Sequence, residues 1–176
     1  MEEIIKRKRD ELKEKFDRVL PVGDYFSDRW EKGSYLNFGS KSNIYDSSYV
    51  FGNPKVGENC WIGPFTILDA ASGSIEIGNN TTIAAGTYIY THDTSKYYAT
   101  EGNIEVEKGN VKIGNNTAIA SKCIICPNVT IGDNCIIGAG SLVNKNIPNN
   151  SVAFGTPAKV VGKVIVDGKN SRIEYF

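Results

Sequence analysis

The sequence predicts an all-β fold, a parallel β-helix whose cross-section has three faces. Large apolar residues recur at every sixth position, glycine often follows them, and a small residue usually stands four places after them. A short strand and a turn repeated every six residues wind a chain into a solenoid. Each apolar residue then points inward and stacks on the residue eighteen positions further along the chain.

The apolar positions define the extent of the repeat. Three extra residues, 74–76, and a longer segment, 95–112, interrupt the register, which resumes after each of them. The fifteen positions are Phe38, Ile44, Val50, Val56, Ile62, Leu68, Ile77, Ile83, Ile89, Ile113, Ile119, Ile125, Ile131, Ile137 and Val143. The spacing does not set the handedness of the solenoid, although the usual crossover rule favours a right-handed turn.

Small residues and asparagines mark the predicted turns. The small residues are Ser42, Ser48, Cys60, Thr66, Ser72, Thr81, Thr87, Thr117, Cys123, Cys135 and Ser141. Asparagine precedes several of them, at Asn59, Asn80, Asn116 and Asn134. Because asparagine tolerates tight or left-handed turns, these positions fit the corners between strands.

The two ends of the chain depart from the repeat. Residues 1–37 are predicted to form an N-terminal helix and a cap, residues 38–148 the β-helix with the loop 95–112 inserted, and residues 149–176 a tail. The helix ends at Pro21 and Gly23 and has one mainly apolar side, made of Ile5, Lys8, Leu12, Phe16 and Val19. The aromatic residues Phe26, Trp30 and Tyr35 are expected to plug the first coil. Beyond Pro148 the repeat stops, and the pattern of 160–175 predicts a terminal strand or hairpin.

The composition excludes several classes of protein. The 176 residues carry 20 Lys and Arg against 20 Asp and Glu, so the charge gives no argument for a nucleic-acid partner. No apolar stretch approaches the roughly 20 residues that span a bilayer, and the charged N-terminus has no signal-peptide core. We therefore expect one folded, cytoplasmic domain with no membrane partner.

Four cysteines include a CxxC pair, Cys123 and Cys126. Such a pair could be a redox centre or half of a zinc site. Cys123 fills the small-residue place of the repeat, however, as Cys60 and Cys135 do, and no second CxxC is present. The sequence favours structural cysteines and no metal site, since free cysteine packs as a small apolar residue.

The only histidine, His92, lies directly before the segment that interrupts the repeat. Two acidic residues also break the repeat nearby: Asp69 stands where glycine is commonest, and Asp93 stands where Ser, Thr or Cys is usual. Adjacent residues of a strand point to opposite faces, so Asp93 is expected to brace the backbone and Asp69 to be the partner of the imidazole. A sequence that breaks its own pattern does so mainly at functional sites. His92 is therefore the leading candidate for a catalytic base.

These features resemble the hexapeptide-repeat acyltransferases over residues 25–163. The resemblance rests on the hexads, on the junction Tyr90-Thr91-His92-Asp93-Thr94 and on the ending Gly155-Thr156-Pro157-Ala158-Lys159. The segments 44–48 and 61–69 are most similar to sugar acetyltransferases of polysaccharide biosynthesis that act on nucleotide-linked amino sugars. The resemblance implies a left-handed parallel β-helix, a homotrimer with active sites between subunits, and acetyl-CoA as the donor substrate.

The resemblance also implies roles for individual residues. His92 would be the general base that takes a proton from a sugar hydroxyl or amine, and the backbone N–H of Ser121 would stabilise the tetrahedral oxyanion. Asp69 and Asp93 would bind the acceptor sugar, and Tyr97 and Tyr98 of the loop 95–112 would cover its pocket across the trimer. The residues matching the CoA-contacting stretch are Ala139, Lys145, Gly155, Thr156, Pro157 and Lys159.

Two other functions compete with acyl transfer. A metalloenzyme of the carbonic-anhydrase type uses three histidines for each zinc, and this chain has one histidine. A non-catalytic trimeric scaffold or binding module predicts that His92 is dispensable. The sequence leaves open the identity of the sugar and nucleotide, the choice between N- and O-acylation, and the acyl group.

Overall fold

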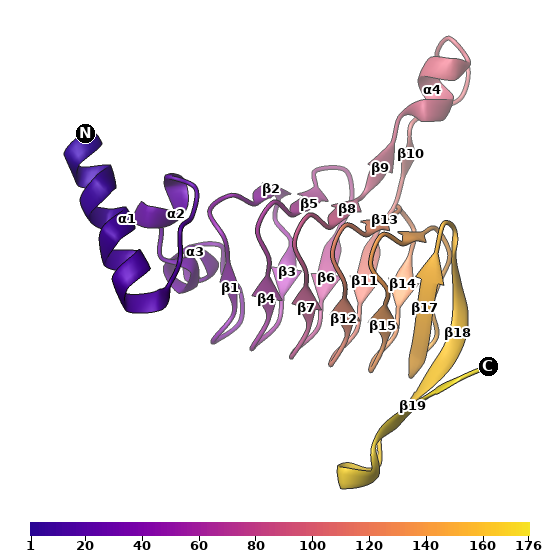
Figure 1. The fold of residues 1–176 in the computed structure, drawn as a ribbon. Coiled ribbons are helices and arrows are strands. Elements are labelled where there is room, and N and C mark those ends of the chain that lie inside the picture. Colours follow the sequence, from indigo (N-terminus) through magenta and orange to yellow (C-terminus); the bar gives the residue numbers. More distant parts are fainter.

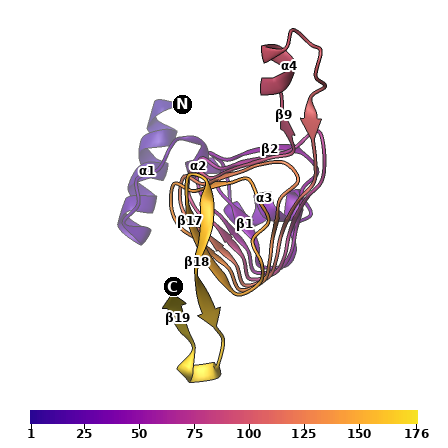
Figure 2. The same cartoon turned by 90° about the vertical axis from the view of Figure 1, so that its right-hand side faces the viewer.

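The computed structural model describes residues 1–176, and it confirms the predicted β-helix. Parallel strands stack coil upon coil along one axis, with helices at the N-terminal end and an antiparallel ribbon at the C-terminal end (Figure 1). Viewed along the axis, successive coils superpose on a three-sided outline (Figure 2). None of the helices combines the length and the apolar character that a membrane-spanning helix needs.

Three sheets form the sides of the solenoid. Sheet A contains β1 (Asn43–Ile44), β4 (Trp61–Ile62), β7 (Thr82–Ile83), β12 (Ala118–Ile119), β15 (Ile136–Ile137) and β17 (Ser151–Gly155). Sheet B contains β2 (Tyr49–Gly52), β5 (Ile67–Ala70), β8 (Tyr88–Tyr90), β13 (Ile124–Ile125) and β16 (Leu142–Val143). Sheet C contains β3 (Lys55–Val56), β6 (Ile75–Ile77), β11 (Val111–Ile113) and β14 (Thr130–Ile131). Neighbouring strands within each of these sets are parallel.

The predicted apolar positions form the core. Fourteen of the fifteen are buried, and Val50 of the first coil is half-buried against them. Ile75, which the repeat left among three extra residues, is fully buried as well and pairs with Val111. The register survives both interruptions, since Ile113 pairs with Ile77 across the longer one. Fully burying such a side chain contributes roughly 1.5–3 kcal/mol, so this column stabilises the whole stack.

The small residues at the corners connect successive coils by hydrogen bonds. The Thr117 hydroxyl donates to the Gly132 carbonyl (2.9 Å) and accepts from the Cys135 N–H (3.1 Å). Cysteine serves the same purpose, because the Cys123 thiol donates to the Gly138 carbonyl at 3.2 Å. The small residues are thus buried donors that satisfy backbone carbonyls. The structural role predicted for Cys123 is confirmed.

A ladder of amide and carboxylate side chains runs along the corner between sheets C and A. The Asn115 side-chain oxygen accepts the N–H of Asn79, and the Asp133 carboxylate accepts the N–H of Asn115. The glycine that precedes each rung makes room for this stacking. A Cβ on Gly114 would collide with the Asp133 carboxylate and with the Gly132 backbone. This close approach explains why glycine follows so many of the apolar positions.

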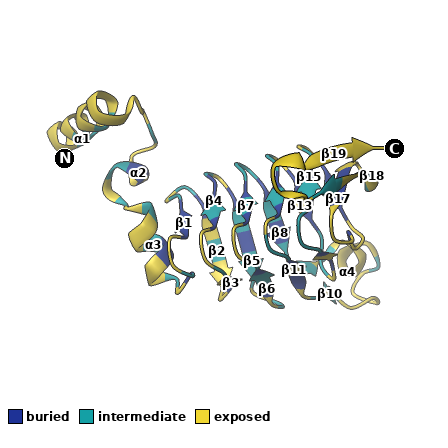
Figure 3. Cartoon of the chain, turned by 90° about the horizontal axis from the view of Figure 1, so that it is seen from below, coloured by how far each residue is buried: buried dark blue, intermediate teal, exposed yellow.

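The N-terminal cap differs from the prediction. The helix α1 (Glu2–Phe16) ends at Asp17, which adopts a left-handed conformation, four residues before Pro21, and it buries no side chain (Figure 3). The short helices α2 (Gly23–Phe26) and α3 (Arg29–Tyr35) follow it. The aromatic plug was wrong, because Phe26, Trp30 and Tyr35 expose 52%, 51% and 81% of their surfaces. Polar groups and the half-buried Leu36, which packs against the core, close the first coil instead.

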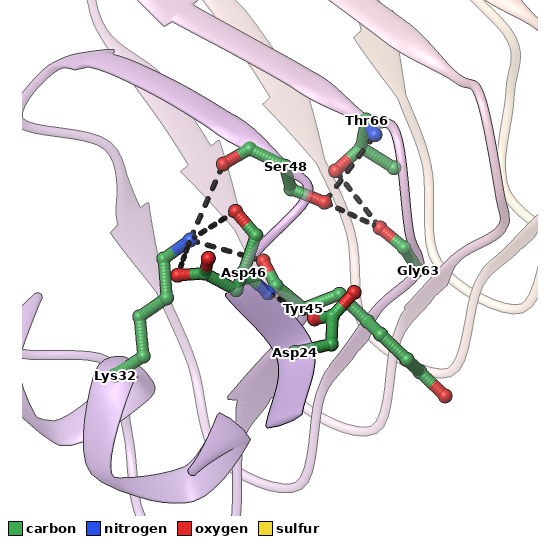
Figure 4. Close-up of polar contacts among 7 residues, drawn as sticks. All are labelled: Asp24, Lys32, Tyr45, Asp46, Ser48, Gly63 and Thr66. Atoms are coloured by element: carbon green, nitrogen blue, oxygen red, sulfur yellow. Dashed lines mark hydrogen bonds and ion pairs between the residues drawn. The ribbon is translucent and has the colours of Figure 1, made fainter. Parts of the chain in front are cut away.

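Lys32 of α3 is the main polar group of this closure (Figure 4). Its ammonium donates to the carbonyls of Tyr45 and Asp46, both at 3.0 Å, and of Ser48 at 3.3 Å. The Asp46 carboxylate lies 3.7 Å from the same ammonium. The first coil has no preceding coil to satisfy these carbonyls, so Lys32 takes the place of the missing neighbour.

The C-terminal end continues further into the solenoid than predicted. Ile147 bridges to Ile131, and Val152 and Ala153 pair with β15, so the stack extends past Pro148. The chain then reverses into β18 (Ala158–Ile165), passes the short 3-10 helix Gly168–Asn170 and ends in β19 (Arg172–Tyr175). Both β17–β18 and β18–β19 are antiparallel, which confirms the predicted terminal hairpin.

Lys32→Met is expected to lower the free energy of unfolding by about 1–3 kcal/mol, because three carbonyl oxygens lose a charged donor. Denaturant-induced unfolding measures the change. Lys41→Met is the matched control, since Lys41 is exposed and its side chain makes no hydrogen bond. Equal unfolding midpoints for the two variants would contradict the capping role of Lys32.

The four thiols should differ sharply in reactivity. Burial raises the pKa of the Cys60, Cys123 and Cys135 thiols, whereas Cys126 is only half-buried, although burial raises the pKa of its thiol too. Thiolate is the reactive form, so a thiol reagent at pH 8 should modify Cys126 first and the other three only on unfolding. Mass spectrometry of the native protein and of Cys126→Ser tests this. Fast modification of more than one thiol in the native protein would refute it.

Candidate functional site

The chain leaves the solenoid directly after β8, at the corner between sheets B and C. The excursion is an ordered ribbon: β9 (His92–Asp93) pairs antiparallel with β10 (Glu107–Lys108), and α4 (Ser95–Ala99) follows β9. The ribbon projects away from the stack, with α4 near its tip (Figure 1). The predicted segment 95–112 was therefore placed a few residues late. Residues 111 and 112 already belong to β11.

His92 lies at the base of this ribbon, against the neighbouring coil. Its Nδ1 is 3.7 Å from the Asp69 carboxylate, with 31% of the His92 side chain and 14% of the Asp69 side chain exposed. That distance is too long for a hydrogen bond, and Nδ1 is buried without another partner. The carboxylate favours the tautomer with the proton on Nδ1, which leaves Nε2 as the basic nitrogen. The predicted pairing of His92 with Asp69 is confirmed as an electrostatic contact.

Backbone contacts hold Asp69 in place beneath the histidine. Asp69 belongs to β5 and pairs with Tyr90, two residues before His92. Its carboxylate accepts the N–H of Ala71 at 3.1 Å, and its carbonyl accepts the Thr91 hydroxyl at 2.7 Å. Thr91 thus fills the buried corner place, as Ser, Thr and Cys do in other coils. The prediction that gave this place to Asp93 was wrong, because the chain has already left the solenoid there.

Asp93 instead shapes the ribbon. It is exposed, and its carboxylate accepts the N–H of Ser95 at 2.7 Å. This hydrogen bond, helped by the Lys96 ammonium, holds the pKa of the Asp93 carboxyl below its usual range. The backbone-bracing role predicted for Asp93 is therefore confirmed. Because the pKa is lowered, the contact is present above about pH 4 and is lost as the carboxyl protonates in acid.

A cavity of about 450 Å³ opens beside His92 on the outer side of sheet B. Four of its eight lining residues are hydrophobic, and the others supply polar groups, a mixture typical of small-molecule sites. The lining residues are Tyr90, His92, Asp93, Thr94, Ile124, Cys126, Pro127 and Leu142. Tyr90, Cys126 and Leu142 were not among the site residues predicted from the sequence. Their outward position on sheet B, one residue beside a buried apolar position, was the signal that could have found them.

The structure does not bring Ser121 to His92 within one chain. Ser121 lies at the corner between β12 and β13, whereas His92 follows the opposite end of the sheet B strands. The Ser121 carbonyl accepts the Gly140 N–H at 2.9 Å, and the Ser121 N–H makes no hydrogen bond. A free N–H suits an oxyanion donor. A site that uses both groups therefore needs a second copy of the chain.

Five of the six residues predicted to contact CoA lie together, and Lys145 lies apart from them. The Thr156 hydroxyl donates to the Gly140 carbonyl at 3.3 Å, which places the turn 155–158 beside exposed Ala139. Lys159 is exposed next to this turn. Lys145 is also exposed, but it follows β16 at the other end of the sheet B strands. Tyr97 and Tyr98 belong to α4, at the tip of the ribbon (Figure 2), and are not among the residues that line the cavity.

Comparison with known proteins agrees with this architecture. The family described as bacterial transferase hexapeptide (six repeats) matches residues 110–145, and the hexapeptide repeat of succinyl-transferase matches residues 55–91. Galactoside O-acetyltransferase of Escherichia coli (strain K12) is 34% identical, with 62% of this chain and 63% of the relative covered. The chain thus spans less than two thirds of the length of this curated relative.

Two solved structures are similar as well. A point mutant of AntD, an N-acyltransferase from Bacillus cereus in complex with dTDP-4-amino-4,6-dideoxyglucose and coenzyme A, has a TM-score of 0.62 and 26% identity, with 70% of each chain covered. A maltose O-acetyltransferase from Clostridium difficile 630 has a TM-score of 0.62 and 32% identity, covering 93% of this chain and 90% of that chain. With this coverage and both repeat matches, the chain belongs to the hexapeptide-repeat acetyltransferase family.

Proposed function

We propose that this protein transfers an acetyl group from acetyl-CoA to a hydroxyl or amino group of a sugar, with His92 as the general base. The observation that carries the proposal is the contact between Asp69 and His92, which lines the cavity. It leaves the other imidazole nitrogen, Nε2, free to accept a proton from the acceptor. The similarity to two sugar O-acetyltransferases and to AntD supports the same chemistry.

The reaction needs one base and one oxyanion donor. His92 Nε2 takes the proton of the acceptor as its oxygen or nitrogen attacks the thioester carbonyl carbon. The tetrahedral intermediate then collapses, the carbon–sulfur bond breaks, and the imidazolium returns the proton to the CoA thiolate. Asp69 stabilises the transient positive charge on the ring. A backbone N–H aimed at the oxyanion, the role given to Ser121, contributes roughly 3–4 kcal/mol to the barrier reduction.

A homotrimer would unite the two groups that one chain keeps apart. The outer side of sheet B is apolar, with Tyr49, Phe51 and Ile124 exposing 63%, 48% and 40% of their surfaces. The outer side of sheet C, in contrast, presents Lys55, Glu76, Lys112 and Thr130. Contiguous exposed apolar surface marks interaction sites. We infer that a neighbouring copy packs along sheet B and brings its Ser121 N–H to His92.

The donor and acceptor would occupy different parts of this interface. CoA would lie along the exposed turn 155–158 and Ala139. Its phosphates would bind Lys159 and the Lys145 of a neighbouring copy. The acceptor would enter the cavity beside His92 and Asp93, with Tyr97 and Tyr98 of a neighbouring ribbon over it. AntD, which is similar to this chain, was solved with an amino sugar on a nucleotide. We infer a nucleotide-linked deoxyamino sugar as the acceptor class.

His92→Gln is expected to lower kcat/KM by about a hundredfold to ten-thousandfold, the usual contribution of a general base. Thiol release from acetyl-CoA with galactosides, maltose and nucleotide-linked amino sugars measures the rate. Asp69→Asn should lower it less, because the base remains. Asp167→Asn, far from the cavity in the C-terminal tail, is the control that should leave it unchanged. Equal turnover by wild type and His92→Gln would refute the mechanism, and no turnover of any acceptor by wild type would favour a scaffold.

Analytical ultracentrifugation should give three times the chain mass for the wild type. Ile124→Glu places a charge on the apolar outer side of sheet B and is expected to shift the protein to the monomer mass. Thr130→Glu introduces the same side chain at an outward position of sheet C and should remain trimeric. A trimer that tolerates Ile124→Glu but not Thr130→Glu would place the interface on sheet C instead.

A further inference from the structure

A second cavity, of about 310 Å³, lies in the N-terminal cap and shares no residue with the cavity beside His92. It lies between α1, the segment 18–30 and the first coil. Leu12 and Phe16 of α1 give it an apolar wall, and Trp30 and Tyr45 add aromatic rings. Its size reaches the lower end of the range for small-molecule sites. Three of its charged residues have atoms that lack a hydrogen-bond or ion-pair partner.

Asp24 is the buried charged group of this cavity. It exposes only 9% of its surface, and its Oδ1 accepts the N–H of Asp46 at 2.8 Å (Figure 4). Its Oδ2 is buried and has no hydrogen-bond partner. A buried carboxylate oxygen without a donor is costly, and native structures seldom keep one without a reason. Because Asp24 lines the cavity, a ligand that donates an N–H or O–H would satisfy this oxygen once the carboxylate turns toward it.

Two guanidinium groups line the same cavity without a carboxylate partner. Arg18 and Arg29 make no ion pair within the chain. The Arg29 guanidinium instead lies 4.7 Å from the Trp30 ring centre and 4.5 Å from that of Tyr45. The adjacent acid, Asp28, already accepts two backbone N–H groups at the start of α3. Both arginines are therefore free to bind an anion, and guanidinium groups suit phosphate particularly well.

We propose that this cap cavity binds a nucleoside diphosphate, either free or as the carrier half of a nucleotide sugar. The ring N–H of the base would donate to Asp24 Oδ2, and the ring would pack on Phe16 and Trp30. The diphosphate would meet Arg18 and Arg29. A sugar without a base would leave the aromatic wall unused, and a base without phosphate would leave both arginines unpaired.

Isothermal titration of the full-length protein with UDP, dTDP and GDP tests the proposal without any measurement of acetyl transfer. At least one of the three should bind to each chain. Asp24→Asn and Arg29→Gln should each weaken binding about tenfold or more, because each removes a charge-assisted contact. Asparagine keeps the oxygen that accepts the Asp46 N–H, and the unfolding midpoint of each variant verifies its fold. Asp10→Asn and Arg7→Gln on α1 are matched controls that should leave binding unchanged.

Two further comparisons of affinity identify the ligand. The matching nucleoside should bind about tenfold or more weakly than its diphosphate. Equal affinity for UDP and UDP-glucose would assign the cavity to the carrier half, and a clear preference for UDP would assign it to the free nucleotide. His92→Gln should bind as wild type does. The proposal is overturned if none of the three nucleotides binds at millimolar concentration, or if Asp24→Asn and Arg29→Gln both bind like wild type.

Discussion

Every feature of this structure depends on the stacking of each coil on the next. Residues equivalent in successive coils share the same hydrogen bonds and the same buried column, as the pairs from Ile44 with Ile62 to Ile125 with Val143 show. An inserted residue in a strand would turn buried side chains outward. Extra chain is therefore tolerated only at corners, and the long ribbon after His92 leaves and returns there without disturbing the register.

This rigid frame determines where chemistry can occur. Asp69 and Tyr90 stand on adjacent strands of sheet B, and the ribbon holds His92 against the Asp69 carboxylate. The strand ends fix these positions, because backbone hydrogen bonds hold every coil. The opposite corner, with its free Ser121 N–H, is equally fixed but lies at the other end of the strands. A rigid single chain cannot close that gap, which is why the proposed site needs a neighbouring copy.

The core could be predicted from the sequence, whereas the cap could not. Burial of Ile83, Ile119 and the other hexad positions follows from a local period that the solenoid keeps throughout. No such period applies to Trp30 or Tyr35, and an aromatic residue type does not by itself predict which surface packs against its side chain. The pairing of His92 with Asp69 was predictable from two breaks in the pattern. Only the outward place beside buried Ile125 marks the cavity-lining Cys126 in the sequence, because its neighbour in space, Tyr90, is 36 positions earlier in the chain.

A crystal structure with CoA and an acceptor sugar would show whether His92 and Ser121 act on the same substrate from two copies of the chain. We expect the reacting oxygen or nitrogen to lie about 2.6–3.2 Å from Nε2 of His92. The thioester carbonyl should face the Ser121 N–H of a neighbouring copy in the same trimer. An acceptor bound away from His92, or a complete site within one isolated chain, would refute this arrangement.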